Sequence, residues 1–176
     1  FISGGSQGSE FITNFATNLI KIIDDEKIIK AKFIFQCPKR MINKTKEKLR
    51  NINSNIFLKE FFINLDEILI DTNLAICRAG AGTIVDLINY KLPSILIPLP
   101  TSKDNHQFEN ASFYNEKKCC WMLNQETFED NIEQLLNSIL SDDSEFLQKK
   151  ENLKKLNYKN TWSNVHQKIL NIIDEN

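Results

Sequence analysis

The placement of glycine constrains this sequence more than any other feature. Its 176 residues include only five glycines, which form two clusters: Gly4, Gly5 and Gly8, then Gly80 and Gly82. Each cluster comes directly after a short apolar run and directly before an amphipathic stretch. Glycine lets the backbone turn sharply and approach a ligand closely, and the first turn of a helix offers unpaired amide groups to an anion. We therefore expect two strand-to-helix turns that face phosphate.

Short apolar or β-branched runs alternate with longer amphipathic stretches along most of the chain. This alternation is typical of βα units around a parallel sheet, so we expect an α/β fold. The expected strands are 1–3, 31–36, 55–58, 74–78, 94–98 and 120–123. The expected helices are 10–23, 39–50, 64–71, 83–90, 105–117 and 127–140, followed by a helical segment from 144 to the end with a break near 157–161. Asn64 and Glu67 are expected to form a capping box at the start of the third helix.

Composition excludes several classes of protein. The chain has 22 basic and 23 acidic residues, so no global field draws in nucleic acid or anionic lipid. A basic segment at 27–50 and an acidic one at 126–145 are expected to be solvated helix faces, or else a patch for a membrane or a partner. No apolar run reaches the roughly 18 residues that span a bilayer, which predicts a soluble intracellular protein. The apolar start and the absence of Met before Met41 suggest a piece of a longer chain.

Cysteine usage points away from metal and redox chemistry. The four cysteines form no C-x-x-C pair, and each lies in or beside an apolar run. We expect them to be reduced core residues. There is also no Asp-x-Asp pair, no G-x-S-x-G turn and no nucleophile beside a base, so the sequence indicates ligand binding more than bond-making chemistry.

Polar residues near the expected strand ends predict the kind of ligand. Two phosphate-facing turns together predict a diphosphate. Asp86, one turn into the glycine-led second helix, can accept hydrogen bonds from a pair of sugar hydroxyls; the alternative is that it only complements the helix dipole. His106 and Gln107 follow the fifth strand, and both can donate and accept hydrogen bonds, which suits a polyhydroxylated group. His166, in the last helical segment, is expected to be structural.

Three motifs, taken together, resemble the carboxyl-terminal half of the MurG family of undecaprenyl-diphospho-muramoylpentapeptide β-N-acetylglucosaminyltransferases. They are Gly4-Gly5-Ser6-Gln7-Gly8, Arg78-Ala79-Gly80-Ala81-x-Thr83, and Asp104-Asn105-His106-Gln107 with Asn110-Ala111, and they match in order and spacing. Phe61-Phe62 and Leu92-Pro93 support the match. The resemblance implies the GT-B glycosyltransferase fold, with a Rossmann-like UDP-sugar-binding domain at 1–143, truncated at its N-terminus, and C-terminal helices at 144–176 packed on it.

The resemblance also implies a substrate-binding role for individual residues. The loop of Gly5, Ser6, Gln7 and Gly8 would contact the diphosphate, and the amides of Ala81, Gly82 and Thr83 would hold a phosphate. The Phe62 backbone would read uracil, Asp86 the ribose, and Gln107 with His106 the N-acetylglucosamine. Arg78, Ile84 and Val85 belong to the same expected site, which includes no catalytic residue, no metal ligand and no cofactor other than the donor UDP-N-acetylglucosamine. The family usually has Ala where this chain has Ser9, Glu where it has Asp86, and a bulkier or hydroxyl residue where it has Gly82.

In this family the amino-terminal half binds the lipid acceptor and supplies the candidate base. The resemblance therefore implies the donor half of an inverting transferase that moves N-acetylglucosamine onto lipid-linked muramoyl-pentapeptide in bacterial peptidoglycan synthesis. Its expected location is the cytoplasmic face of the inner membrane, with no nucleic-acid partner. Three alternatives remain open: a stand-alone donor subunit with a separate acceptor chain, as in the dolichol pathway, a UDP-sugar-binding module without transfer, and a UDP-N-acetylglucosamine epimerase. An epimerase would need acid/base carboxylates and His in the cleft, a set that the sequence lacks.

Overall fold

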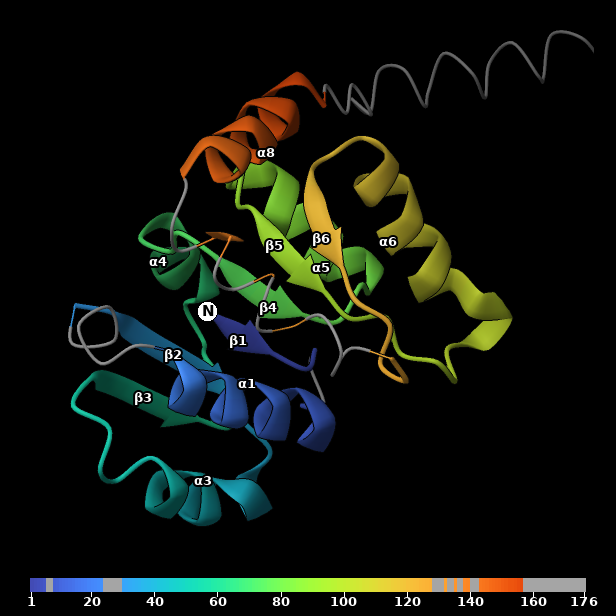
Figure 1. Ribbon diagram of the computed structural model, residues 1–176. Helices are drawn as coiled ribbons and strands as arrows, with labels where there is room; N and C mark the ends of the chain where they lie inside the picture. Colours follow the sequence, from blue (N-terminus) through green and yellow to red (C-terminus); the bar gives the residue numbers. More distant parts are fainter. Residues whose placement is uncertain are drawn as a thin grey trace, which may run out of the picture.

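The fold is built on one parallel sheet. The computed structural model describes residues 1–5, 8–23, 30–127, 132, 135, 138, 139 and 143–156. Six parallel strands form the sheet in the order β3-β2-β1-β4-β5-β6 (Figure 1). This is the strand order of a dinucleotide-binding Rossmann fold, and the expected α/β class is confirmed. The strands are β1 Ile2–Ser3, β2 Lys32–Gln36, β3 Asn55–Lys59, β4 Ala75–Cys77, β5 Ser94–Leu96 and β6 Cys120–Met122.

Helices connect successive strands. They are α1 Glu10–Ile22, the short 3-10 helix η1 Lys39–Met41, α3 Ile42–Lys48, α4 Leu65–Ile70, α5 Ala81–Asn89, the 3-10 helix η2 Lys103–Asn105, α6 His106–Glu116 and α8 Asp143–Lys155. Most of the helix expected over 127–140, and the chain from 157 to 176 with its expected break and His166, lie outside the described residues. None of the described helices is both long enough and apolar enough to cross a membrane.

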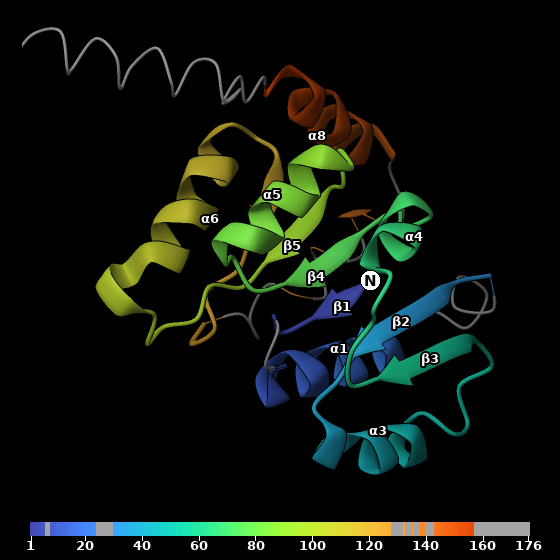
Figure 2. The same ribbon diagram turned by 180° about the vertical axis from the view of Figure 1, so that it is seen from behind.

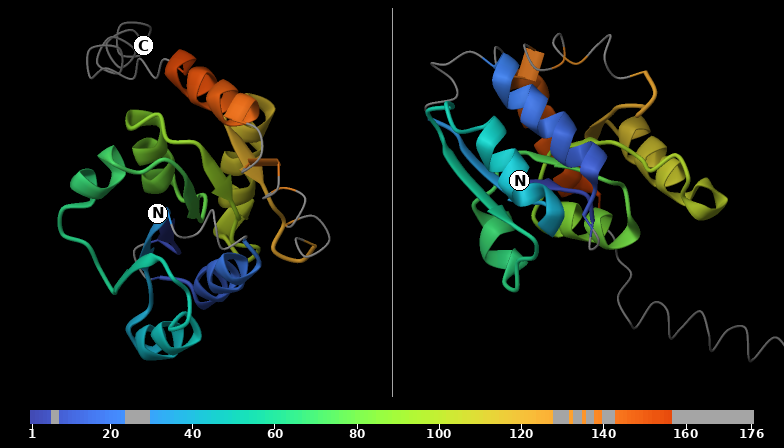
Figure 3. Two further views of the ribbon diagram at one scale, coloured as in Figure 1. Left: turned by 60° about the vertical axis from the view of Figure 1, so that its left-hand side comes forward. Right: turned by 90° about the horizontal axis from the view of Figure 1, so that it is seen from below.

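The helices cover the sheet in two layers (Figures 1, 2 and 3). Successive side chains of a strand point to opposite faces, so β4, β5 and β6 each contribute to two hydrophobic clusters. The cluster under α1 and α3 includes Ile2, Phe35, Ile76, Ile95 and Trp121. The cluster under α4, α5 and α6 includes Ala75, Cys77, Leu96 and Cys120. All four cysteines are buried and free, as expected of reduced core residues.

Helix α8 lies beside the amino end of β6, where the Asn152 side-chain amide donates to the Lys118 carbonyl at 3.1 Å. Leu153 of α8 is buried in the cluster of α4, α5 and α6, and Phe146 packs against the other cluster. These contacts join the described part of 144–176 to the sheet, and the division at residue 143 stays a prediction.

One detail of the expected helix caps is wrong. Asn64 precedes α4, but its side chain makes no cap hydrogen bond to the backbone. Instead, its amide Nδ2 donates to the Glu67 carboxylate at 2.9 Å. The two side chains that would have capped the backbone reciprocally are therefore bonded to each other.

The strand order determines where a ligand can bind. β1 leads into α1 on one face of the sheet, whereas its neighbour β4 leads into α5 on the opposite face. The two connections diverge at the carboxyl ends of adjacent strands, which leaves a crevice there. Both glycine clusters follow these two strands, so the fold brings together segments that are more than 70 residues apart in sequence.

Candidate functional site

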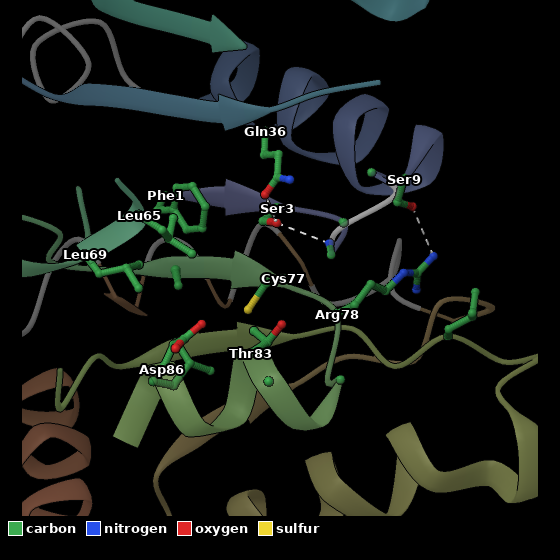
Figure 4. A pocket seen from close by; sticks show the side chains of 18 of the residues that line it. Phe1, Ser3, Ser9, Gln36, Leu65, Leu69, Cys77, Arg78, Thr83 and Asp86 are labelled. Carbon is green, nitrogen blue, oxygen red and sulfur yellow. Dashed lines mark hydrogen bonds between the residues drawn. The ribbon is translucent and has the colours of Figure 1, made fainter. Parts of the chain in front are cut away.

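A cavity of about 550 Å³ opens where β1 and β4 end (Figure 4). Its walls come from the loop after β1, the start of α5, helix α4 and the loop after β5. Figure 4 shows the side chains of Leu65, Leu69 and Asp86 toward one end and those of Ser9 and Arg78 toward the other. The cavity therefore runs from a largely apolar end, beside a carboxylate, to a polar end.

The loop after β1 has the conformation that glycine was expected to permit. Gly5 and Gly8 have φ values of +86° and +69°, and the Gly8 amide donates to the Gly5 carbonyl at 2.9 Å. A Cβ added at Gly8 would also lie 2.9 Å from Pro38 Cγ. Gly8 therefore lies tightly against Pro38, just after β2, and Gly5 and Gly8 both line the cavity.

Buried hydrogen bonds fix the start of this loop. The Gly5 amide donates to Ser3 Oγ at 3.2 Å, and the Ser3 hydroxyl donates to Gln36 Oε1 at 2.9 Å. Ser3 and Gln36 are both buried, so each bond satisfies a polar group that has little access to water. The chain of bonds links the ends of β1 and β2 and orients the glycine loop.

The second cluster opens α5 with unpaired amides. Gly80 is the N-cap and provides no side-chain cap, and the first intrahelical bond of this helix runs from the Ile84 amide to the Gly80 carbonyl at 3.0 Å. The amides of Ala81, Gly82 and Thr83 precede that bond, so they are available to an anion. Gly82 and Thr83 line the cavity.

Asp86 lies one turn further along α5 and also lines the cavity. Burial raises the pKa of its carboxyl above the ordinary value, and the negative charge of Asp66 adds to the increase. The ionised carboxylate can accept hydrogen bonds only, which suits a pair of hydroxyl groups. Leu65 and Leu69 lie toward the same end of the cavity (Figure 4), and Phe61 also lines the cavity, so these side chains offer apolar contact to a flat ring.

Arg78 crosses the polar end of the cavity. The Arg78 residue is 5% exposed, and its guanidinium donates to the Ile97 and Pro98 carbonyls, both at 3.0 Å. It also donates to Gln125 Oε1 at 2.6 Å and to Ser9 Oγ at 3.4 Å. Ser9 is at the same time the N-cap of α1, because its Oγ accepts from the Ile12 amide at 3.2 Å. Arg78 thus joins the start of α1 to the loops after β5 and β6.

The third motif divides into residues inside and outside the cavity. Gln107 lines it, and its Oε1 accepts from the Leu99 amide at 3.1 Å. His106 is exposed, is absent from the cavity walls, and places its Nδ1 2.6 Å from the Lys103 carbonyl. Asp104 and Asn105 both have positive φ, a conformation that Asp and Asn tolerate better than other side chains. This double turn directs Gln107 inward.

The structure brings together seven of the expected site residues as cavity walls: Gly5, Gly8, Arg78, Gly82, Thr83, Asp86 and Gln107. Ser6 and Gln7 lie outside the described residues. The Ile84 side chain is buried in the core, whereas Val85 is 54% exposed, and neither lines the cavity. The Phe62 ring packs edge-to-face on Phe1, with centroids 6.4 Å apart. Ala81 does not line the cavity, and its predicted contribution is its backbone amide, which belongs to the first turn of α5.

Several cavity residues were not expected from the sequence, including Ser3, Gln36, Phe61 and Leu99. Their common signal was position, since each lies at or just after the carboxyl end of an expected strand. Among the described residues, no group of three His, Cys, Asp or Glu side chains could hold a metal ion. The polar groups that face the cavity are mainly amides, hydroxyls, one carboxylate and one guanidinium.

Comparison with known proteins gives one family over nearly the whole chain. Residues 1–168 match the family described as glycosyltransferase family 28 C-terminal domain. A Pelagibacter ubique protein is 38% identical over an alignment of 177 positions, which covers 99% of this chain and 49% of that protein. A Campylobacter jejuni protein is 36% identical over 78% of this chain and 39% of its own length. Both carry the name UDP-N-acetylglucosamine–N-acetylmuramyl-(pentapeptide) pyrophosphoryl-undecaprenol N-acetylglucosamine transferase.

The crystal structure of Acinetobacter baumannii MurG is similar in fold. It matches with a TM-score of 0.75 and 21% identity, over 88% of this chain and 44% of that one. The chain therefore spans about half the length of the curated relatives it matches. The MurG resemblance stated from the three motifs is confirmed at the level of the carboxyl-terminal domain.

Proposed function

The chain belongs to the glycosyltransferase family 28 C-terminal domain family, and from this premise we propose that it binds UDP-N-acetylglucosamine as the donor half of an N-acetylglucosaminyltransferase. The observation that carries the proposal is the order of chemical groups along one cavity. An apolar end, a carboxylate, two amide-rich turns and a polar end follow one another. Uracil, ribose, diphosphate and N-acetylglucosamine follow one another in the donor in the same order.

Each part of the donor has a matching group in this proposal. Uracil lies against Phe61, Leu65 and Leu69, with the backbone near Phe62 reading its edge. Asp86 accepts hydrogen bonds from the ribose hydroxyls. The two negative phosphates lie between the glycine loop and the first turn of α5, where amide groups and the positive end of the helix dipole favour anions.

The sugar occupies the remaining polar end. The Gln107 side chain can donate from Nε2 to a sugar hydroxyl while its Oε1 stays bonded to the Leu99 amide. His106 stays a predicted neighbour of the sugar, although it is exposed and lies outside the cavity walls. The loop residues Ser6 and Gln7 remain predicted diphosphate contacts.

Transfer requires more than this half. An acceptor hydroxyl must attack the anomeric carbon as the bond to UDP breaks, and a base must take the hydroxyl proton. In the proposal these groups come from a second domain, either in the same polypeptide or in a separate chain, that binds the undecaprenol-linked muramyl-pentapeptide. The complete enzyme would work in peptidoglycan synthesis, as a peripheral protein on the cytoplasmic face of a bacterial inner membrane.

Product formation from labelled UDP-N-acetylglucosamine and the lipid-linked acceptor tests this division of labour. The 176-residue chain alone should bind donor and form no product, and a mixture with an amino-terminal half from a relative should form product. The Asp86→Ala variant is the control: in the mixture it should lower product formation, because it removes the proposed ribose contact. Robust turnover by the chain alone would contradict the proposal.

A further inference from the structure

Arg78 is a buried cation whose hydrogen-bond acceptors are all neutral. Four of its five N–H groups donate to the Ile97 and Pro98 carbonyls, the Ser9 hydroxyl and the Gln125 amide oxygen. Within the described part of the chain, no carboxylate lies within 4.0 Å of the guanidinium. The ring of Phe11 adds a further neutral contact, with the guanidinium carbon 5.3 Å from its centroid.

A buried charge without an ion-pair partner is costly, so this arrangement calls for an explanation. The burial has a measurable consequence, since it lowers the Arg78 pKa to about 10. Arg78 also lies close to both helix starts that face the cavity. It is two residues before Gly80, the N-cap of α5, and its Nη2 contacts Ser9, the N-cap of α1.

We infer that Arg78 is a positioning residue whose uncompensated charge attracts the diphosphate, while its hydrogen bonds hold the loops around the cavity. The inference rests on the proposed function, because it assigns the anion to a bound nucleoside diphosphate. Four N–H groups are already used within the protein, so Arg78 acts mainly through its charge rather than as a direct phosphate ligand. In a site of reduced dielectric, that charge acts over several ångströms.

Gln125 has a specific part in this arrangement. Its Oε1 makes the shortest bond to the guanidinium, at 2.6 Å, from a residue 47 positions further along the chain. A glutamate at this position would have the same shape and would neutralise Arg78. The neutral Gln125 amide instead accepts the hydrogen bond from the guanidinium and leaves the positive charge of Arg78 available to the ligand.

The test compares UDP with uridine, which lacks phosphate, in the 176-residue chain and its variants. Gln125→Glu should weaken UDP binding roughly tenfold and leave uridine binding unchanged. It should also raise the melting temperature of the ligand-free protein, because the new carboxylate pairs with Arg78. Gln125→Met is the matched control, since it removes the hydrogen bond without adding charge, and it should keep the ratio of UDP to uridine affinity.

Substitution of Arg78 itself distinguishes loss of its positive charge from direct repulsion between the carboxylate introduced by Gln125→Glu and the phosphates. Arg78→Lys should keep most of the affinity ratio and its dependence on salt, whereas Arg78→Gln should lose both. An unchanged ratio in folded Gln125→Glu protein would overturn the inference, as would equal losses in Gln125→Glu and Gln125→Met. If the wild type still binds UDP, either of these two results leaves the proposed function intact. A wild type that binds neither UDP nor uridine would overturn both.

Discussion

The Oε1 atom of Gln107 accepts a hydrogen bond from the backbone amide of Leu99 at 3.1 Å. This bond ties the start of α6 to the loop that leaves β5 and orients the Gln107 amide. Among the described residues, its Nε2 makes no hydrogen bond that competes with a ligand. The Gln107 side chain lines the cavity, so its amide donor is held there beside the loop that leaves β5.

Gln107→Ala should weaken UDP-N-acetylglucosamine binding by roughly tenfold, the value of one good hydrogen bond, because the sugar loses its donor. UDP, which has no sugar, should bind about as it does to the wild type. Asn115→Ala is the matched control, since that side chain lies on the same helix, is exposed and does not line the cavity, and it should change neither affinity. Competitive binding measurements give both values. An equal loss for UDP and UDP-N-acetylglucosamine would mean that Gln107 acts only through the Leu99 loop.

Asp86 gives the ligand-free protein a defined dependence on pH. Its pKa is raised by burial and by Asp66, so folding favours the protonated carboxyl. This contribution to stability is complete below the unfolded value of 3.8 and is lost as the pH rises through the raised folded pKa. Asp86→Asn should therefore raise the melting temperature at pH 7, and the gain should vanish as the pH approaches 3.8. Thermal melts of both proteins across this range check the prediction, and a gain that grows toward acid pH would refute it.

Two glycines should respond to alanine in opposite directions. Gly8 has a φ of +69° and lies against Pro38, so Gly8→Ala should cost at least about 1–2 kcal/mol of unfolding free energy. A Cβ at Gly82 meets nothing within 4 Å, so Gly82→Ala should add up to about 1 kcal/mol through helix propensity. Denaturant unfolding measures both. Equal losses at the two positions would contradict this account of the two turns.

The strands and the two glycine turns could be predicted from the sequence because their signals are local. Short apolar runs mark β4 and β5, and a glycine cluster follows both β1 and β4. The sequence placed the start of α5 at Thr83, two residues later than the observed start at Ala81. Gly82 has low helix propensity, and the first turn of a helix carries no periodic apolar pattern that would have marked it.

Long-range contacts could not be predicted in the same way. The sequence indicated Arg78 as a site residue. Its hydrogen-bond partners, however, lie at the start of α1, after β5 and after β6, and no local pattern connects Arg78 with Gln125. The same limit applies to Phe61 and Phe62, which are adjacent and both aromatic. Only the folded chain shows that Phe61 lines the cavity while Phe62 packs on Phe1.

The central claim is that this domain holds the donor's diphosphate with amides and one buried cation, and a calorimetric titration with UDP-N-acetylglucosamine in the presence of a chelator tests it most directly. The account predicts saturable one-to-one binding that persists without divalent ions. Asp86→Ala should weaken it by roughly one to two decades through the lost ribose contact. Binding that disappears in chelator, or an Asp86→Ala affinity equal to that of the wild type, would contradict the account.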